Sequence, residues 1–81
     1  MAKLVPKDPI QQQITNLGTR IKKLRKDKGF TNYEFFAYEK KIGRSQYGQY
    51  EKGVDMRLSS IIKIANAHGL SLKEFFSNGF E

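Results

Sequence analysis

Residues 30–53 read FTNYEFFAYEKKIGRSQYGQYEKG, and this stretch decides the fold expected for the whole chain. Thr31 opens a T-x-x-E pattern, which predicts a capping box at the start of a helix that ends near Lys40. The segment IGRSQYGQYEKG has a glycine near each end and predicts a second short helix whose Tyr47 and Tyr50 face inward. Two short helices therefore follow one another across a turn of about three residues.

Three further helices are predicted outside this stretch. Asp8 and Gln11 predict a capping box for a first helix, whose apolar stripe ends at Gly29. A second stripe ends at Gly69, and Ser71 opens an S-x-x-E capping box for a last short helix. We therefore expect an all-α fold of five helices without strands. The apolar positions are Ile10, Ile14, Leu17, Ile21 and Leu24 in the first helix, Leu58, Ile61, Ile62, Ala65 and His68 in the fourth, and Leu72, Phe75 and Phe76 in the fifth.

Size and composition limit what the chain can be. Its 81 residues contain no cysteine, so we expect one small core without disulfides and no second domain. Residues 1–7 are expected to form a flexible N-terminal arm, residues 8–77 the domain and residues 78–81 a C-terminal tail. No apolar run approaches the roughly 18 to 20 residues that span a bilayer, and the start MAKLVPKD lacks the apolar core of a signal peptide. These features predict a cytoplasmic protein with no membrane partner.

The charge of the chain indicates its partner. Fifteen Lys and Arg against eight Asp and Glu give a net charge of +7, which favours a polyanion such as nucleic acid. One histidine, no cysteine and no acidic cluster leave little material for catalysis or for a metal ion. We therefore expect a binding protein, not an enzyme, with no cofactor and no metal site.

The two short helices have the layout of a helix-turn-helix, and their sequence resembles that motif in the phage-repressor and Cro-like family, also called the XRE type. Phe36 and Ala37 match the Leu-Ala pair of the family, and the segment from Glu51 to Gly53 matches its Glu-x-Gly ending. With the downstream helices included, the resemblance covers residues 17–77. It implies a lambda-repressor-like fold with the helix-turn-helix in the second and third helices. The function it implies is a sequence-specific transcriptional regulator, expected as a repressor and associated with the nucleoid, that inserts the third helix into the major groove of double-stranded DNA.

The resemblance assigns base-contacting positions in the third helix. Arg44 and Ser45 match two positions that face the groove, Gln49 matches a third one turn later, and Gln46 is the weaker candidate. An Arg side chain donates two hydrogen bonds to guanine, Gln pairs with adenine, and Ser suits either base. The alternative is that Arg44 and Gln49 only solvate an exposed face or contact phosphate.

The resemblance also assigns contacts to the DNA backbone. The start of the second helix matches a site where N–H groups and a polar side chain meet phosphate, as helix dipoles favour. Basic side chains just after the third helix and near the fourth complete the set. The expected backbone contacts are Thr31, Asn32, Tyr33, Lys52, Arg57 and Lys63.

Two further matches concern the core. Arg25 and Glu51 match a pair that forms a salt bridge between the first and third helices of the family, so we expect Glu51 to be structural. His68 stands where the family usually has Leu. It is expected to be a partly buried core histidine rather than a metal ligand, because no second ligand accompanies it.

The chain departs from the family pattern within the motif itself. The predicted second helix carries one extra residue between Thr31 and Phe36. Lys41 stands at a turn position that is commonly Gly, and because positive φ would cost Lys about 1 kcal/mol, we expect a turn of different shape. Gly43 replaces the usual Ser or Thr cap. Gly48 lies inside the third helix, where it is unfavourable by about 1 kcal/mol relative to Ala.

Other interpretations stay open beside the regulator. They are the antitoxin of a toxin–antitoxin pair, a protein-interaction module that has kept the fold without DNA binding, and a basic nucleoid protein without sequence preference. A protein partner, such as a toxin or a co-regulator, stays open too. We expect a homodimer, because one short recognition helix touches only about four or five base pairs. Phe76 and Phe80 are the candidates for the contact between copies. The alternative is that Phe75 and Phe76 close the monomer's own core, Phe80 folds back over them, and the monomers pair only on DNA.

Overall fold

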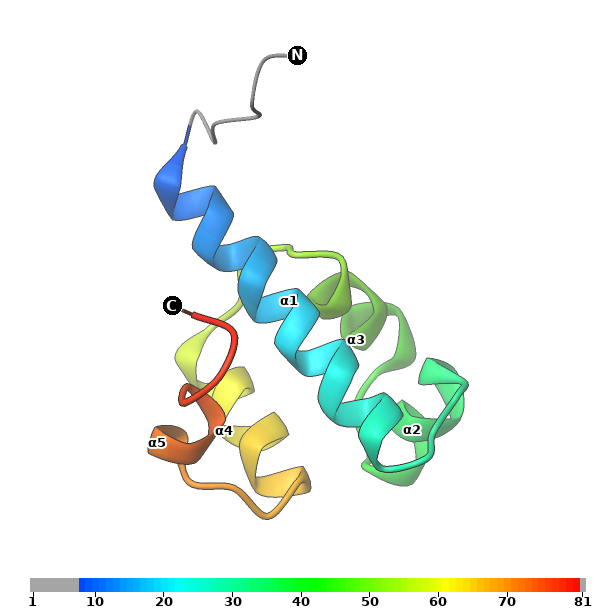
Figure 1. Cartoon of the computed structure of the whole chain (residues 1–81). Coiled ribbons are helices and arrows are strands. Elements are labelled where there is room, and N and C mark those ends of the chain that lie inside the picture. The colour runs from blue at the N-terminus through cyan, green and yellow to red at the C-terminus, as the bar shows by residue number, and fades with distance from the viewer. Residues whose placement is uncertain (1–7, 81) are drawn as a thin grey trace.

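The computed structural model describes residues 8–80, which fold into five α-helices and contain no strand (Figure 1). The helices are α1 (Pro9–Asp27), α2 (Tyr33–Glu39), α3 (Arg44–Glu51), α4 (Leu58–Ala67) and α5 (Leu72–Phe75). Figure 1 shows α2 and α3 on one side of the long α1, and α4 and α5 on the other side. The expected all-α, five-helix fold is confirmed. The expected N-terminal arm, residues 1–7, lies outside the described residues.

The core lies where the five helices meet, and each helix contributes one large side chain to its centre. The rings of Phe36 and Tyr47 pack together with their centroids 5.2 Å apart, which joins α2 to α3. Because every helix supplies part of one core, none of them can separate without exposing apolar surface to water. The five largest fully buried side chains are Ile21, Phe36, Tyr47, Ile64 and Phe75.

Helices α1 and α3 are in close contact at Gly18. A Cβ atom at Gly18 would lie 2.8 Å from the backbone N of Gly53 and 2.8 Å from the carbonyl O of Tyr50. Backbone atoms in a packed core cannot move aside as a flexible side chain can, so this contact requires glycine. Toward the start of α1, Nε2 of Gln11 donates a hydrogen bond of 3.2 Å to the carbonyl of Gly53. Asp8 caps α1 through the N–H of Ile10 at 3.0 Å and not through that of Gln11, so the capping box predicted with Gln11 is wrong.

The start of α2 differs from the prediction by one residue. Oδ1 of Asn32 accepts hydrogen bonds from the N–H groups of Glu34, at 2.7 Å, and Phe35, at 3.1 Å. Asn32 is thus the N-cap, and the capping box predicted at Thr31 is wrong. Counting from Asn32, Phe36 takes the fourth position of the helix and faces the core. The extra residue of this chain therefore lies in the loop before the cap and not inside the helix.

The turn between α2 and α3 keeps a residue in the left-handed conformation. Lys41 has a φ angle of 58°, so the expectation of a turn of different shape is wrong. The N–H of Lys41 donates to the carbonyl of Tyr38 at 3.1 Å, and that of Ile42 donates to Ala37 at 2.8 Å. These bonds offset the strain of a left-handed lysine, which costs about 1 kcal/mol. Gly43 is the N-cap of α3 and, as expected of glycine, supplies no side-chain hydrogen bond.

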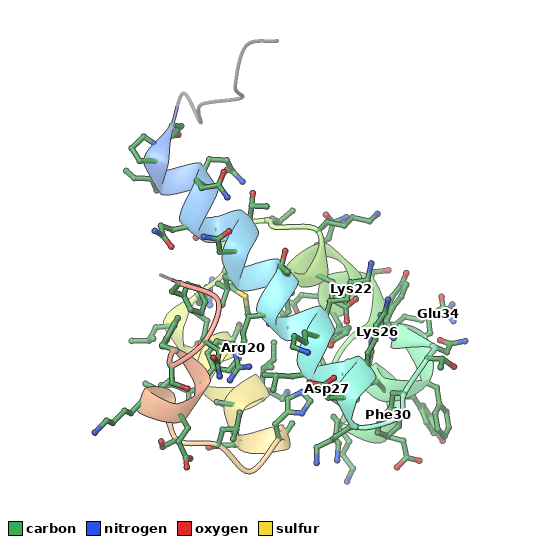
Figure 2. The ribbon with its side chains drawn as sticks, in the orientation of Figure 1. Arg20, Lys22, Lys26, Asp27, Phe30 and Glu34 are labelled. Atoms are coloured by element: carbon green, nitrogen blue, oxygen red, sulfur yellow. The ribbon has the colours of Figure 1, made fainter. Side chains whose placement is uncertain are left out.

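A buried arginine attaches α5 to α1. Nε of Arg20 donates to the carbonyl of Phe75 at 2.8 Å, and Nη2 donates to the carbonyl of Glu74 at 3.1 Å. Figure 2 shows Arg20 on the side of α1 that faces α4 and α5. A guanidinium suits the last carbonyls of a helix, which carry a negative partial charge. The predicted capping box of α5 is confirmed, and the backbone N–H of Ser71 lowers the pKa of the Glu74 carboxyl that it bonds.

Several apolar side chains predicted for the core are exposed instead. Leu58 and Ile62 face solvent because α4 turns Ile61 and Ile64 inward, so its buried face is rotated relative to the predicted stripe. Ile10 is exposed as well, because the first turn of α1 extends beyond the core (Figure 1). The spacing of the apolar residues predicted the helices correctly and their buried faces only in part.

His68 is partly buried at the end of α4, as expected. Its ring stacks on Phe36 with centroids 5.1 Å apart and planes 15° apart, and its Nε2 is buried without a hydrogen-bond partner. Burial, together with the charges of Lys28, Lys40 and Arg20, lowers the pKa of His68 from 6.5 to about 4. The fold therefore favours the neutral form of the ring.

We predict that His68 makes the fold sensitive to acid. Because folding lowers the pKa of His68, its contribution to stability is present above pH 6.5 and is lost as the pH falls toward 4. Wild-type protein should lose about 1 to 3 kcal/mol more stability than His68→Leu between pH 7 and pH 4.5, as measured by denaturant unfolding. The carboxyl groups are common to both proteins and cancel in this difference. Parallel pH profiles would show that His68 has no such effect.

Candidate nucleic-acid interface

The outer face of α3 is polar. Tyr47 and Tyr50 are buried, which confirms the predicted inward orientation and turns the opposite face of the helix to solvent. Ser45 and Gln49 are four residues apart and share this outer face, whereas Tyr47 lies midway between them and points the other way. The remaining exposed residues of α3 and its C-cap are Arg44, Gln46 and Lys52.

Arg44 and Gln46 lie on the two flanks of this outer face. Arg44 precedes Gly48 by four residues, and Gly48 faces the ring of Tyr33 in α2. Gln46 precedes Tyr50 by four residues and lines a hollow of about 370 Å³ at the start of α4. The exposed polar residues from the start of α2, across α3, to the start of α4 are called the polar surface below.

The polar side chains at the start of α2 differ in which groups they leave for a ligand. Oδ1 of Asn32 already accepts the two capping hydrogen bonds, so the side-chain NH₂ is the group that a ligand would meet. Tyr33 packs its ring near that of Tyr47, with centroids 6.4 Å apart, and keeps 37% of its surface exposed. Thr31 is exposed and precedes the cap.

The start of α4 lies at the other end of this polar surface. Arg57 is the N-cap residue and makes no side-chain capping bond, so its side chain does not cover the start of α4. The hydroxyls of Tyr50 and Ser60 lie 3.2 Å apart and connect α3 to α4. Nζ of Lys63 instead donates to the carbonyl of Lys41 at 3.3 Å. The structure thus brings Arg57 to the polar surface and leaves Lys63 bonded to the turn between α2 and α3.

Arg25 and Glu51 form a buried ion pair behind the polar surface, where a salt bridge was expected. Nε of Arg25 lies 2.7 Å from Oε2 of Glu51, and Nη2 lies 3.0 Å from Oε1. The two side chains are only 4% and 8% exposed. Nη1 donates to the carbonyl of Phe30 at 2.7 Å, and the hydrogen bonds that Arg25 donates to the Glu51 carboxylate raise the pKa of Arg25. One guanidinium therefore joins α1, the end of α3 and the loop before α2.

Comparisons with known proteins agree with this geometry. A family model described as helix-turn-helix matches residues 21–75, which include the whole of α2, α3, α4 and α5. Control protein C.MunI of a Mycoplasma species is 36% identical to this chain over 62 residues, which are 75% of this chain and 84% of that protein. The chain belongs to the XRE/Cro-like helix-turn-helix family. No solved structure gives a significant match.

As a member of the XRE family, the chain is a DNA-binding transcriptional regulator, and it binds DNA through the helix-turn-helix formed by α2 and α3. The family is not enzymatic. Within residues 8–80, no three His, Cys, Asp or Glu side chains gather where they would hold a metal ion. No helix in the same range is long and apolar enough to cross a membrane.

Three features of this XRE-type interface have no counterpart in the sequence-based predictions. The first is the close approach of α1 to α3 at Gly18. The sequence did contain a signal for it, because a glycine inside an amphipathic helix is unfavourable and usually has a packing reason. The second is the bond from Gln11 to Gly53, which spans 42 residues and leaves no local pattern. The third is the close approach of the Tyr33 ring to Gly48 inside α3.

We predict that the ion pair behaves as one unit in stability. Arg25→Met and Glu51→Leu should each destabilise the fold by up to about 3 to 5 kcal/mol, because each leaves one buried charge without its partner. The double variant should be milder than the sum of the two, since it leaves no unpaired charge. Thermal melts of the four proteins measure this cycle. Strictly additive effects would contradict the assignment of these residues as a coupled pair.

Proposed function

We propose that this regulator recognises a specific sequence in double-stranded DNA by inserting α3 into the major groove. The supporting observation is the face of α3 opposite its two buried tyrosines, where every exposed side chain is polar. Arg44 and Gln49 are the proposed base contacts of greatest weight, with Ser45 beside them and Gln46 on the flank toward α4. Their donors and acceptors suit base edges, and an α-helix fits the width of the major groove.

The proposed contacts to the DNA backbone flank α3 on both sides. The start of α2 lies on the flank of Gly48, beside Tyr33, and the start of α4 lies on the flank of Gln46. Phosphates border the major groove in the same way, so these groups would fix the position of α3 without reading sequence. The proposed backbone contacts are Thr31, Asn32, Tyr33, Lys52, Arg57 and, through its charge alone, Lys63.

Repression is the expected result of such binding, because a protein bound over a promoter excludes other proteins from it. The likeness to control protein C.MunI supports a role in gene control. The antitoxin alternative differs by requiring a toxin as a second partner. Purification of the chain together with a stably bound toxin from its native cells would establish that alternative.

We predict that Arg44 and Gln49 read bases. Arg44→Ala and Gln49→Ala should each weaken binding to the preferred duplex by about 1 to 3 kcal/mol and hardly change binding to random DNA, because only base contacts carry sequence information. The preferred duplex is the one that wild-type protein selects from random DNA. Fluorescence anisotropy with both kinds of duplex gives the affinities.

Lys52→Ala is the matched control for this experiment. It should weaken binding to both duplexes alike and make the plot of log affinity against log salt shallower by about one unit, because it removes one phosphate contact. If Arg44→Ala and Gln49→Ala also weaken both duplexes equally, they contact phosphate and not bases. A wild-type protein without any preferred duplex would be a nucleoid-type binder instead.

We also infer that the regulator acts as a homodimer. An apolar groove of about 590 Å³ lies between the start of α1, the start of α4 and the C-terminal segment, with Ile10, Ile14, Met56, Phe76 and Phe80 in its wall. Phe80 lies in the segment expected as a tail but packs on Phe76, with ring centroids 5.1 Å apart. Ile10 protrudes at the groove with 71% of its surface exposed. One face thus carries both a protruding side chain and a hollow, as a self-complementary two-fold contact requires.

We predict that Ile10→Lys abolishes the dimer. A charge in an apolar contact between copies is costly, whereas Ile10 is already exposed in the monomer, so the thermal stability of the monomer should not fall. Tyr38→Lys is the control, because Tyr38 is 78% exposed but belongs to α2, away from the groove. Sedimentation at micromolar concentration should show dimers for wild type and the control and monomers for Ile10→Lys. Monomeric wild type whose selected DNA lacks an inverted repeat would refute the dimer.

A further inference from the structure

The helix α3 contains a glycine where a helix former would be expected, and Tyr33 lies directly against it. A Cβ atom at Gly48 would lie 3.0 Å from Cε1, 3.1 Å from Oη and 3.2 Å from Cζ of Tyr33. These distances are shorter than ordinary van der Waals contacts. The hydroxyl end of the Tyr33 ring therefore lies against the backbone of α3, in space that any other residue at position 48 would occupy.

The Tyr33 ring is held from a second direction by the core. It stacks near Tyr47 with centroids 6.4 Å apart and planes 29° apart, and Tyr47 is itself fully buried. Tyr33 is also the first residue of α2, directly after the cap. The side chain is thus fixed by the start of α2, by Tyr47 and by the bare backbone at Gly48.

The contact between Tyr33 and Gly48 places the Tyr33 hydroxyl at the proposed DNA surface. Gly48 lies one residue before Gln49 and one turn after Arg44, so it borders the outer face of α3 on the side toward α2. Tyr33 keeps 37% of its surface exposed, so the side chain is not closed off by its contacts with α3 and the core. A phenol at this point suits a phosphate oxygen, which accepts its O–H bond.

We propose that Gly48 is a positioning residue for DNA recognition, which allows the Tyr33 hydroxyl to lie against α3 and donate a hydrogen bond to a phosphate at the border of the groove. This role rests on the proposed insertion of α3 into DNA. This role explains why glycine, the poorest helix former other than proline, stands at position 48 of α3. The space next to its backbone is filled by the Tyr33 ring. A purely flexible role for Gly48 would predict no dependence on Tyr33.

A double-mutant cycle tests the proposal with wild type, Gly48→Ala, Tyr33→Ala and the double variant. The atoms that a methyl group at position 48 would meet belong to the end of a side chain, so Gly48→Ala displaces the Tyr33 ring while the chain still folds. Each single variant should bind the duplex selected by wild type about tenfold more weakly, as loss of one hydrogen bond to a charged group implies. The double variant should bind no more weakly than Tyr33→Ala. The salt dependence should stay unchanged in all four proteins, because no charge is removed.

Thermal melts of the same four proteins give a second, independent measurement. In the Tyr33→Ala background, Gly48→Ala should raise Tm, because alanine is the better helix former and no ring stands in its way. In wild type it should give no such rise. Gly43→Ala, at the N-cap of α3, is the control, since a Cβ there meets nothing closer than 3.9 Å, and its effects should add to those of Tyr33→Ala.

The outcomes separate this proposal from the proposed function. Additive effects of Gly48→Ala and Tyr33→Ala on affinity would overturn the positioning role, as would full affinity in Gly48→Ala. If wild type selects no duplex, the proposed sequence-specific function fails and the DNA part of this proposal fails with it. The Tm cycle would still decide whether Gly48 makes room for Tyr33, because it needs no DNA.

Discussion

The bidentate ion pair between Arg25 and Glu51 is the interaction on which the position of α3 depends. Two buried charges are tolerated only with good geometry and additional hydrogen bonds. Both conditions hold, because the paired atoms lie 2.7 and 3.0 Å apart and the third nitrogen of the guanidinium donates to the carbonyl of Phe30. These bonds reach α1, α3 and the loop before α2 at once. They therefore set the direction in which α3 presents its outer face.

The helix α3 has little stability of its own. It contains eight residues, its cap glycine supplies no side-chain hydrogen bond, and Gly48 lies within it. A helix of this length is marginal in water, so its shape comes from packing. Burial of Tyr47 and the close approach of α1 at Gly18 supply that packing. The polar surface of α3 is accordingly a product of the whole domain and not of the eight residues that carry it.

The long helix α1 connects the two surfaces that the proposed function requires. One side of α1 contacts α3 through Gly18 and Arg25, and the other side binds the end of α5 through Arg20. The first turn of α1 forms part of the apolar groove proposed to join two copies. In such a dimer the distance between the two α3 helices would depend on the rigidity of α1. That distance must match the spacing of half-sites along DNA, about one helical turn.

The sequence by itself determined the number, the order and nearly all bounds of the helices, because caps, glycines and apolar spacing act over a few residues. The Arg25 and Glu51 pair came from the family resemblance, since no local pattern connects residues so far apart. Only the tertiary structure decided that Lys41 is left-handed and that Gly18 and Gly48 are needed for close contacts. The physical reason is that these features are fixed by the free energy of contacts between separate helices, which offsets local strain and local propensity and is absent from any short stretch of sequence.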